Sequence, residues 1–292
     1  MSETEKVLYV TDLDGTILRD DGRLSDYTRD TLNDLIANGL RLTAATGRTF
    51  SSTRWALAGV NLREPVVCNN GVFVIDYPTG HILYKAILEG AEKEKMLDFL
   101  CSRQIPALVF AMIEGREYVS WMRGWETDSV RRFIADREGS GLYLRPVDNR
   151  EELGAGEVAQ FGIITTKEEA YALRDLCAAH LCAAQGTEYV LYLMDDNRHK
   201  MDWWLEIYRP GLDKGTGVAQ VKELLGVDKI VAFGDNLNDL PLFAAADECY
   251  AVANAKEELK AVATGVIGSN EEDGVARWLA EHGEFLAPPR TS

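Results

Sequence analysis

The chain has 292 residues, enough for one large domain or two modest ones, and its 46% hydrophobic and 27% charged residues are typical of a soluble globular protein. Its formal net charge of −16 is offset by no basic cluster, which argues against binding to nucleic acid or to an anionic membrane. No apolar run approaches the roughly 20 residues of a membrane helix, and the acidic N-terminus is not typical of a secretory signal. The five scattered cysteines lack paired spacing, so we expect reduced thiols and a cytoplasmic protein.

Strands and helices alternate in the first part of the chain. The pattern predicts a strand at 7–11, a helix from Ser25 as its cap to about 38, a strand at 40–45, a helix from about 50 to 58 and a strand at 65–68. Polar residues follow each strand. This alternation predicts a Rossmann-like, doubly wound parallel sheet, in which ligands bind beyond the carboxyl ends of the strands.

The pattern changes between residues 84 and 194. Here the sequence predicts a helix at 91–101, a hairpin of strands at 107–113 and 117–121, a helix from about 126 to 135, a Gly-rich loop, a strand at 158–165, a helix at 167–180 and a strand at 188–194. This mixture is typical of an α+β module. We therefore expect a separate cap domain, inserted between strands of the first domain.

The alternating pattern returns in the last part of the chain. After the segment 203–207 it predicts a helix at 214–225, a strand at 230–233, a helix at 240–245, a short strand at 250–253 and a loose tail at 287–292. The domain prediction is therefore an α/β core of residues 1–83 and 195–292, with an α+β cap of residues 84–194.

Two carboxylates stand two residues apart in the Asp-Leu-Asp-Gly-Thr segment at 12–16. Asp12 and Asp14 would repel each other at the end of an apolar strand unless a cation or a shared proton lies between them. A carboxylate can attack phosphorus to form an aspartyl-phosphate, while its neighbour gives and takes protons. The alternative interpretation is a solvated loop with a helix cap.

Two further segments place polar groups at a strand end and at a helix start. Thr46, Gly47 and Arg48 offer a hydroxyl, a bare amide and a guanidinium, which suit three phosphate oxygens, although a simple turn with an exposed arginine has the same sequence. Lys214 opens a predicted helix, where a cation is slightly unfavourable. This unfavourable position of a cation at a helix start is compatible with a functional role for Lys214.

The segment Gly-Asp-Asn-Leu-Asn-Asp at 234–239 follows the most apolar strand of the chain. Asp235 and Asp239 contribute two carboxylates, and Asn236 and Asn238 contribute two amides. Oxygen-rich clusters of this kind suit Mg²⁺. The alternative interpretation is a turn that caps the next helix.

The order of these four motifs resembles that of the haloacid dehalogenase superfamily, and the large insertion between the second and third resembles its Cof-like phosphatases with a type-two cap. Segments 69–71 (Asn-Asn-Gly), 252–255 and 272–275 also look like that subgroup. The resemblance covers essentially the whole chain, although the inserted module is matched by position and size only.

The resemblance implies a role for each matching residue. Asp12 would be the nucleophile and a metal ligand, and Asp14 would be the general acid/base with its backbone carbonyl on the metal. Asp235 would complete the Mg²⁺ site, Lys214 would neutralise charge, and Asp239 would support the metal or Lys214. Thr46, Gly47 and Asn238 would bind the phosphoryl group, and Arg48 and Asn70 would contact substrate or cap.

The function that the resemblance implies is a Mg²⁺-dependent phosphatase acting through an aspartyl-phosphate. We expect a small phosphorylated metabolite as substrate, a sugar phosphate above all, with the cap closing over the site and contacting the leaving group. A phosphomutase on the same core and a non-catalytic sugar-phosphate sensor are the alternatives. A monomer is the default expectation, and a dimer is possible.

Overall fold

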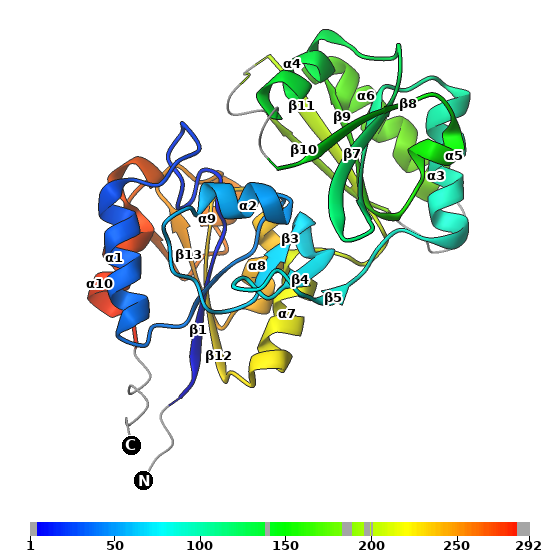
Figure 1. Cartoon of the computed structure of the whole chain (residues 1–292). Coiled ribbons are helices and arrows are strands. Elements are labelled where there is room, and N and C mark those ends of the chain that lie inside the picture. Colours follow the sequence, from blue (N-terminus) through cyan, green and yellow to red (C-terminus); the bar gives the residue numbers. More distant parts are fainter. Residues whose placement is uncertain (1–4, 138–140, 183–188, 196–198, 200, 285–292) are drawn as a thin grey trace. The chain divides into compact units, whose positions relative to one another are not determined.

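The computed structural model describes residues 5–137, 141–182, 189–195, 199 and 201–284 (Figure 1). Part of the predicted Gly-rich loop, the first residue of the predicted strand at 188–194 and the predicted loose tail lie outside the described residues. The chain divides into two compact units: a core unit, Met1–Lys85 with Asp213–Ser292, and an inserted unit, Ala86–Leu212. Within the described part of the chain, no helix is both long and apolar enough to cross a membrane.

A five-stranded parallel sheet forms the centre of the core unit. Its strands, in spatial order, are β14 (Gly265–Ile267), β13 (Glu248–Val252), β12 (Lys229–Gly234), β1 (Val7–Thr11) and β2 (Leu42–Ala44). Outward from the β1–β12 pair, the sheet continues to β2 on the side of β1 and to β13 and β14 on the side of β12. The sheet is therefore doubly wound, with its topological switch point between β1 and β12.

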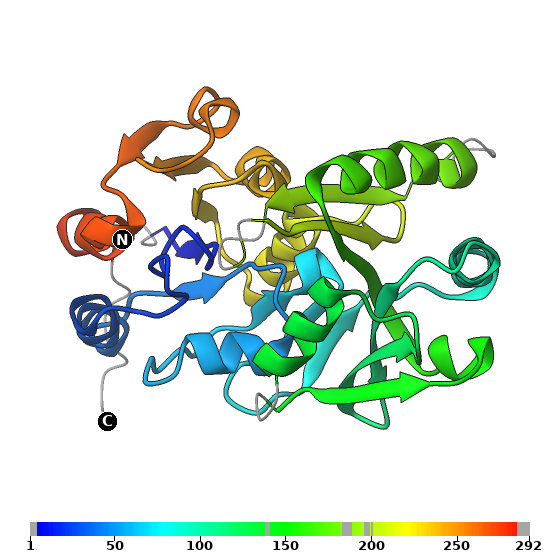
Figure 2. The ribbon, with the colours of Figure 1, turned by 90° about the horizontal axis from the view of Figure 1, so that it is seen from above.

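Helices cover both faces of this sheet. They are α1 (Asp26–Ala37), α2 (Phe50–Ala56), α7 (Lys214–Leu225), α8 (Leu240–Ala245), α9 (Glu257–Lys260) and α10 (Gly274–His282). Figures 1 and 2 show α1 and α10 side by side, and Figure 1 shows α7 and α8 on the other side of β1 and β12. The central strands β1 and β12 and the edge strand β2 are buried along almost their whole length, which explains their largely apolar sequences.

The third predicted strand is paired differently from the expectation. It is β3 (Val66–Cys68), which pairs antiparallel with β4 (Phe73–Ile75), and β4 pairs antiparallel with β5 (Ile82–Lys85). A single parallel bridge, Ala45 to Val67, connects β3 to the main sheet. The prediction of a third full parallel strand is corrected, because the chain reverses directly after Cys68 and returns beside the same strand.

The inserted unit is built on a six-stranded mixed sheet. Its strands, in spatial order, are β10 (Val190–Asp195), β11 (Trp203–Tyr208), β9 (Glu157–Thr165), β6 (Ala107–Ile113), β7 (Arg116–Met122) and β8 (Tyr143–Val147). Its helices are α3 (Gly90–Ser102), α4 (Asp128–Arg137), α5 (Arg150–Leu153) and α6 (Lys167–Cys177). A large apolar cluster fills one face of the sheet and a smaller one, around Phe110, Phe133 and Trp204, lies on the other.

The predicted domain bounds place residues 203–207 in the α/β core, and this assignment is wrong. β11 pairs antiparallel with both β10 and β9 inside the inserted sheet. The inserted unit consequently ends at Leu212 rather than at the predicted boundary after residue 194. The cause is a tertiary one, since an isolated apolar strand carries no local signal of which sheet it will join.

Candidate active site

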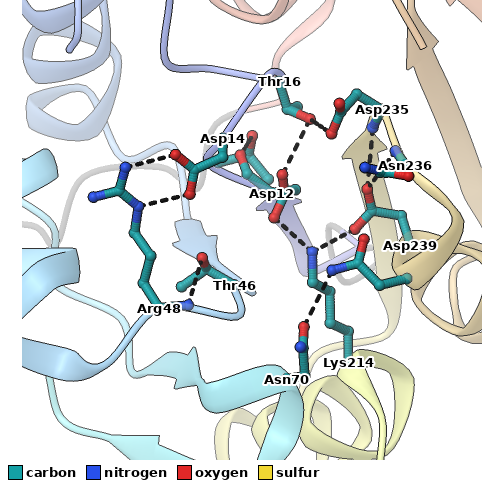
Figure 3. Close-up of polar contacts among 12 residues, drawn as sticks. Asp12, Asp14, Thr16, Thr46, Arg48, Asn70, Lys214, Asp235, Asn236 and Asp239 are labelled. Carbon is teal, nitrogen blue, oxygen red and sulfur yellow. Dashed lines mark hydrogen bonds and ion pairs between the residues drawn. The ribbon is translucent and has the colours of Figure 1, made fainter. Parts of the chain in front are cut away.

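The predicted site residues gather at the carboxyl ends of the core strands (Figure 3). Asp12 directly follows β1 and Asp235 directly follows β12, and these two strands are hydrogen-bonded neighbours at the switch point. Thr46 follows β2 after a single residue, and Lys214 is the first residue of α7. The fold therefore brings four separate stretches of sequence to one edge of the sheet.

Lys214 lies fully buried between two carboxylates. Its Nζ donates to Asp12 Oδ1 at 2.5 Å and to Asp239 Oδ1 at 2.6 Å, and only 1% of its side chain is exposed. Asp213 caps the helix that begins with Lys214, through a reciprocal bond with Thr216. The cation at a helix start is therefore stabilised by two acidic partners rather than by solvent.

The electrostatics of this cluster are set by burial. Burial raises the pKa of Asp12 to about 7, because the nearby positive charge of Lys214 only partly opposes the desolvation of the carboxylate and Asp239 adds to the rise. Burial alone would lower the pKa of Lys214, but the charges of Asp12 and Asp239 outweigh it and raise that pKa. Lys214 is therefore charged and paired in the folded protein.

Asp239 serves as a partner of Lys214 and of the backbone. Its Oδ2 accepts the backbone N–H groups of Asp235, at 3.0 Å, and Asn236, at 3.1 Å, while its Oδ1 accepts from Lys214. Of the two roles predicted for this residue, the support of Lys214 is the one that these bonds favour.

Thr16 is a member of this site to which sequence reasoning gave no role of its own. Its buried hydroxyl lies 3.3 Å from Asp12 Oδ2 and 3.1 Å from Asp235 Oδ1. A hydroxyl has a single hydrogen to donate, so it can serve only one of these carboxylates at a time. The signal was available, because Thr16 closes the motif that contains Asp12.

The donor set fits a divalent cation. One ligand atom each of Asp12, Asp235 and Asp239 lie within 4.8 Å of one another. Burial raises the pKa of Asp235 well above its ordinary value, and the negative charges of Asp12 and Asp239 raise it further. Three mutually repelling carboxylates so close together, two of them buried, are the setting that Mg²⁺ stabilises.

Asp14 points away from this cluster and toward Arg48 (Figure 3). The guanidinium donates from Nε to Asp14 Oδ2 at 2.6 Å and from Nη2 to Oδ1 at 2.5 Å, which makes a bidentate ion pair. Burial would lower the pKa of Arg48, but the hydrogen bonds and charge of Asp14 outweigh it and raise that pKa. Sequence reasoning placed Arg48 against substrate or cap and missed this pairing.

The remaining predicted residues line the same edge. The Thr46 hydroxyl accepts the backbone N–H of Arg48 at 3.2 Å, and Gly47 lies between these two residues. Asn238 donates from Nδ2 to Asn70 Oδ1 at 3.3 Å. The structure thus brings all ten predicted site residues into the core unit, at one end of its parallel sheet.

Comparison with known proteins gives consistent results. A family model described as haloacid dehalogenase-like hydrolase matches residues 9–279. The chain is 28% identical to the 5-amino-6-(5-phospho-D-ribitylamino)uracil phosphatase YitU of Bacillus subtilis, over 96% of this chain and 98% of the relative. It is 24% identical to the pyridoxal phosphate phosphatase YbhA of Escherichia coli, over 93% and 96% of the two chains.

Solved structures share the fold. A haloacid dehalogenase-like hydrolase from Bacteroides thetaiotaomicron aligns with a TM-score of 0.77 at 21% identity, over 95% of this chain and 99% of its own. The protein TM0651 from Thermotoga maritima aligns with a TM-score of 0.75 at 21% identity, over 96% and 98% of the two chains. The predicted superfamily, the α/β core with its insertion and the predicted class of enzyme are confirmed. The chain belongs to the haloacid dehalogenase-like hydrolase family.

Proposed function

We propose that this protein is a Mg²⁺-dependent phosphatase that hydrolyses a small phosphorylated metabolite through an aspartyl-phosphate on Asp12. The observation that carries the proposal is the buried Lys214, held between Asp12 and Asp239 beside Asp235. A lysine in this position fixes the carboxylate of Asp12 and neutralises part of the charge that an incoming phosphate would bring. An acidic protein needs such a local cation to accept an anionic substrate at all.

The chemistry follows from the order of the side chains. The Asp12 carboxylate attacks phosphorus, and the bond between phosphorus and the leaving oxygen breaks. Asp14 gives a proton to that oxygen, and for this step it must be in its protonated form, whereas its ionised form pairs with Arg48. The Asp14 carboxylate then takes a proton from water, which attacks phosphorus and releases inorganic phosphate and Asp12. Thr46, Gly47 and Asn238 hold the phosphoryl oxygens during both steps.

The metal site of this proposal uses Asp12, Asp235 and the backbone carbonyl of Asp14, with Asp239 behind Lys214. Bound Mg²⁺ would supply positive charge next to the phosphoryl oxygens. The raised pKa of Asp12 and of Asp235 supports the assignment, because burial and mutual repulsion disfavour both ionised carboxylates and a bound cation would oppose both effects.

We assign the substrate to phosphate esters of primary alcohols, with sugar and sugar-alcohol phosphates first. The two relatives named above act on a phosphorylated ribityl chain and on pyridoxal phosphate. Such alkoxides are poor leaving groups, so they require the acid that Asp14 provides. The inserted unit, Ala86–Leu212, occupies the place of a cap domain in the chain, and we assign to it the choice between leaving groups. A cytoplasmic location and a monomeric state stay predictions, to be checked by fractionation and light scattering.

The test is phosphate release from a panel of sugar phosphates, sugar-alcohol phosphates, nucleotides and pyridoxal phosphate, with Mg²⁺ and with EDTA. Release should require the metal and should be abolished in Asp12→Asn. The matched control is Asp34→Asn, which changes an exposed aspartate of α1 in the same way and should leave turnover unchanged. A folded, Mg²⁺-binding wild type that releases no phosphate from any member of the panel would refute the proposal.

A further inference from the structure

Three consecutive buried residues of the core unit have a left-handed backbone. They are Asn69 with φ 50°, Asn70 with φ 49° and Gly71 with φ 105°. Residues with a side chain rarely adopt this conformation, although asparagine tolerates it better than most. Strained backbone is concentrated at functional sites, where the surrounding structure holds it in place.

The backbone of this segment binds the loop that contains Thr46. The N–H of Asn70 donates to the carbonyl oxygen of Thr46, and the N–H of Asn69 donates to the carbonyl oxygen of Arg48, each at 2.9 Å. The two bonds flank Gly47. The left-handed turn therefore fixes both ends of the Thr46–Arg48 segment without using a side chain.

The side chain of Asn70 connects that loop with the segment after β12. It is fully buried, its Oδ1 accepts from Asn238 Nδ2 at 3.3 Å, and its amide group lies against the backbone of Gly47. A Cβ atom added at Gly47 would stand only 3.1 Å from Asn70 Nδ2. The amide of Asn70 is thus packed between two residues to which the proposed function gives the phosphate.

We propose that Asn70 is a positioning residue, which holds the Thr46–Gly47 segment and the amide of Asn238 in one fixed arrangement for the phosphoryl group. This inference rests on the proposed function, because that function assigns the phosphate to these residues. It gives Asn70 a role different from the predicted contact with substrate or cap, which stays a prediction. The left-handed backbone is what allows one residue to bond Thr46 through its N–H and Asn238 through its side chain.

Two substitutions separate the backbone from the side chain. Asn70→Gly keeps the left-handed conformation and removes the amide, whereas Asn70→Ala removes the amide and penalises the backbone as well. We expect Asn70→Gly to unfold at the wild-type temperature and Asn70→Ala to unfold at a lower one. The control is Gln104→Gly, which introduces glycine at a left-handed φ of 52° in the inserted unit.

The probe is inorganic phosphate, measured by calorimetry with the full-length protein in saturating Mg²⁺. Asn70→Gly should weaken phosphate binding about threefold to tenfold, the effect of a neutral hydrogen bond. Its affinity for Mg²⁺ should be unchanged, because the candidate metal ligands are the carboxylates of Asp12, Asp235 and Asp239, whereas the side chain of Asn70 bonds Asn238. With a substrate, the same variant should raise KM by a similar factor.

A double-mutant cycle shows whether Asn70 acts through its partner. If it does, Asn70→Gly combined with Asn238→Ala should bind phosphate about as weakly as Asn238→Ala alone. Additive losses would overturn the proposal, as would unchanged phosphate affinity in Asn70→Gly. A parallel loss of Mg²⁺ affinity and thermal stability in that variant would also overturn it, since Asn70 would then support the fold in general. A failure of the proposed function appears separately, as a wild type that binds phosphate but hydrolyses nothing.

Discussion

Replacing Lys214 by methionine tests the electrostatic basis of the site. The substitution keeps an unbranched side chain of similar length and removes the cation between Asp12 and Asp239. Both carboxylates are buried and lose their ammonium partner, while Asp235 lies within 4.8 Å of them. Water cannot replace the lost charge at a position this deeply enclosed.

The expected effect is large for a single substitution. Removing one partner of a buried ion pair costs about 3–5 kcal/mol in the free energy of unfolding. For a chain of this size, each kcal/mol corresponds to roughly 2–4 °C in Tm, so the expected fall is on the order of 10 °C. The loss should be smaller below pH 7, because burial raises the pKa of Asp12 to about 7 and a protonated Asp12 needs no cation.

The assay is thermal unfolding of wild type and Lys214→Met at pH 8, in EDTA and in Mg²⁺. Lys222→Met is the matched control on the same helix, because Lys222 is 37% exposed and its carboxylate partner is 3.4 Å away. We expect a change of less than about 1 kcal/mol for the control and partial recovery of Lys214→Met in Mg²⁺. A Lys214→Met variant that unfolds in EDTA at the same temperature as Lys222→Met would refute the reasoning.

Three further predictions follow from the site. In EDTA, Asp12→Asn should gain stability relative to wild type as pH rises from about 4 to 7. Burial raises the pKa of Asp12 from 3.8 to about 7, so in this window the folded wild type keeps a proton that the unfolded chain has lost. The stability of the wild type therefore falls as pH rises, whereas that of Asp12→Asn lacks this dependence. Denaturant unfolding at several pH values measures the difference in unfolding free energy between Asp12→Asn and wild type, and a difference that does not change with pH would contradict the prediction. Arg48→Ala should lower kcat about tenfold more for alkyl phosphates than for p-nitrophenyl phosphate. The reason is that Asp14 loses its bidentate partner, and only the alkyl leaving group needs a proton from Asp14. Equal losses of kcat for both substrates would assign Arg48 to the phosphate itself. Gly71→Ala should cost about 1–3 kcal/mol or more in unfolding free energy, because its Cβ would stand 2.2 Å from a backbone oxygen in a residue with φ 105°. Gly226→Ala is the control and should cost less, because open space surrounds that position. Equal costs for the two variants would show that the left-handed backbone conformation alone sets the cost.

The core elements could be predicted from sequence because their limits are local. Ser25 accepts the N–H of Thr28 at the start of α1, and Gly226 ends α7 with a left-handed φ of 56°. Caps of this kind depend on two or three neighbouring residues. The limits of α7 agree with the prediction at both ends for that reason.

Other elements depend on distant partners and could not be predicted. β8 contains Pro146 and lies at the edge of the inserted sheet, where a proline is tolerated but the strand signal is weak. β11 was assigned to the core by position alone, and its sheet is decided by pairing with β9, some 40 residues away. Local pattern establishes that a strand exists, and packing establishes where it pairs.

The same distinction applies to the site. The motif residues were predicted because polar side chains at strand ends meet at one edge of a parallel sheet. The resemblance implied the pairing of Asp239 with Lys214, but two other pairings were not predicted. Arg48 and Asp14 are 34 residues apart, and Thr16 and Asp235 are 219 apart. The turns after each strand decide which polar groups pair, and the spacing of residues in the sequence does not predict the conformation of those turns.

The position of β1 in the sheet has a consequence for synthesis of the chain. Its partner β12 and the helix that carries Lys214 are synthesised much later, and Lys214 is 202 residues beyond Asp12. On the ribosome, β1 therefore has one open edge while some 200 residues are added, roughly 10–40 s at ordinary rates of translation. During that time an apolar strand lacks its second neighbour, which makes the nascent core a substrate for chaperones. A chain cut short within the insertion has the nucleophile but never an active centre.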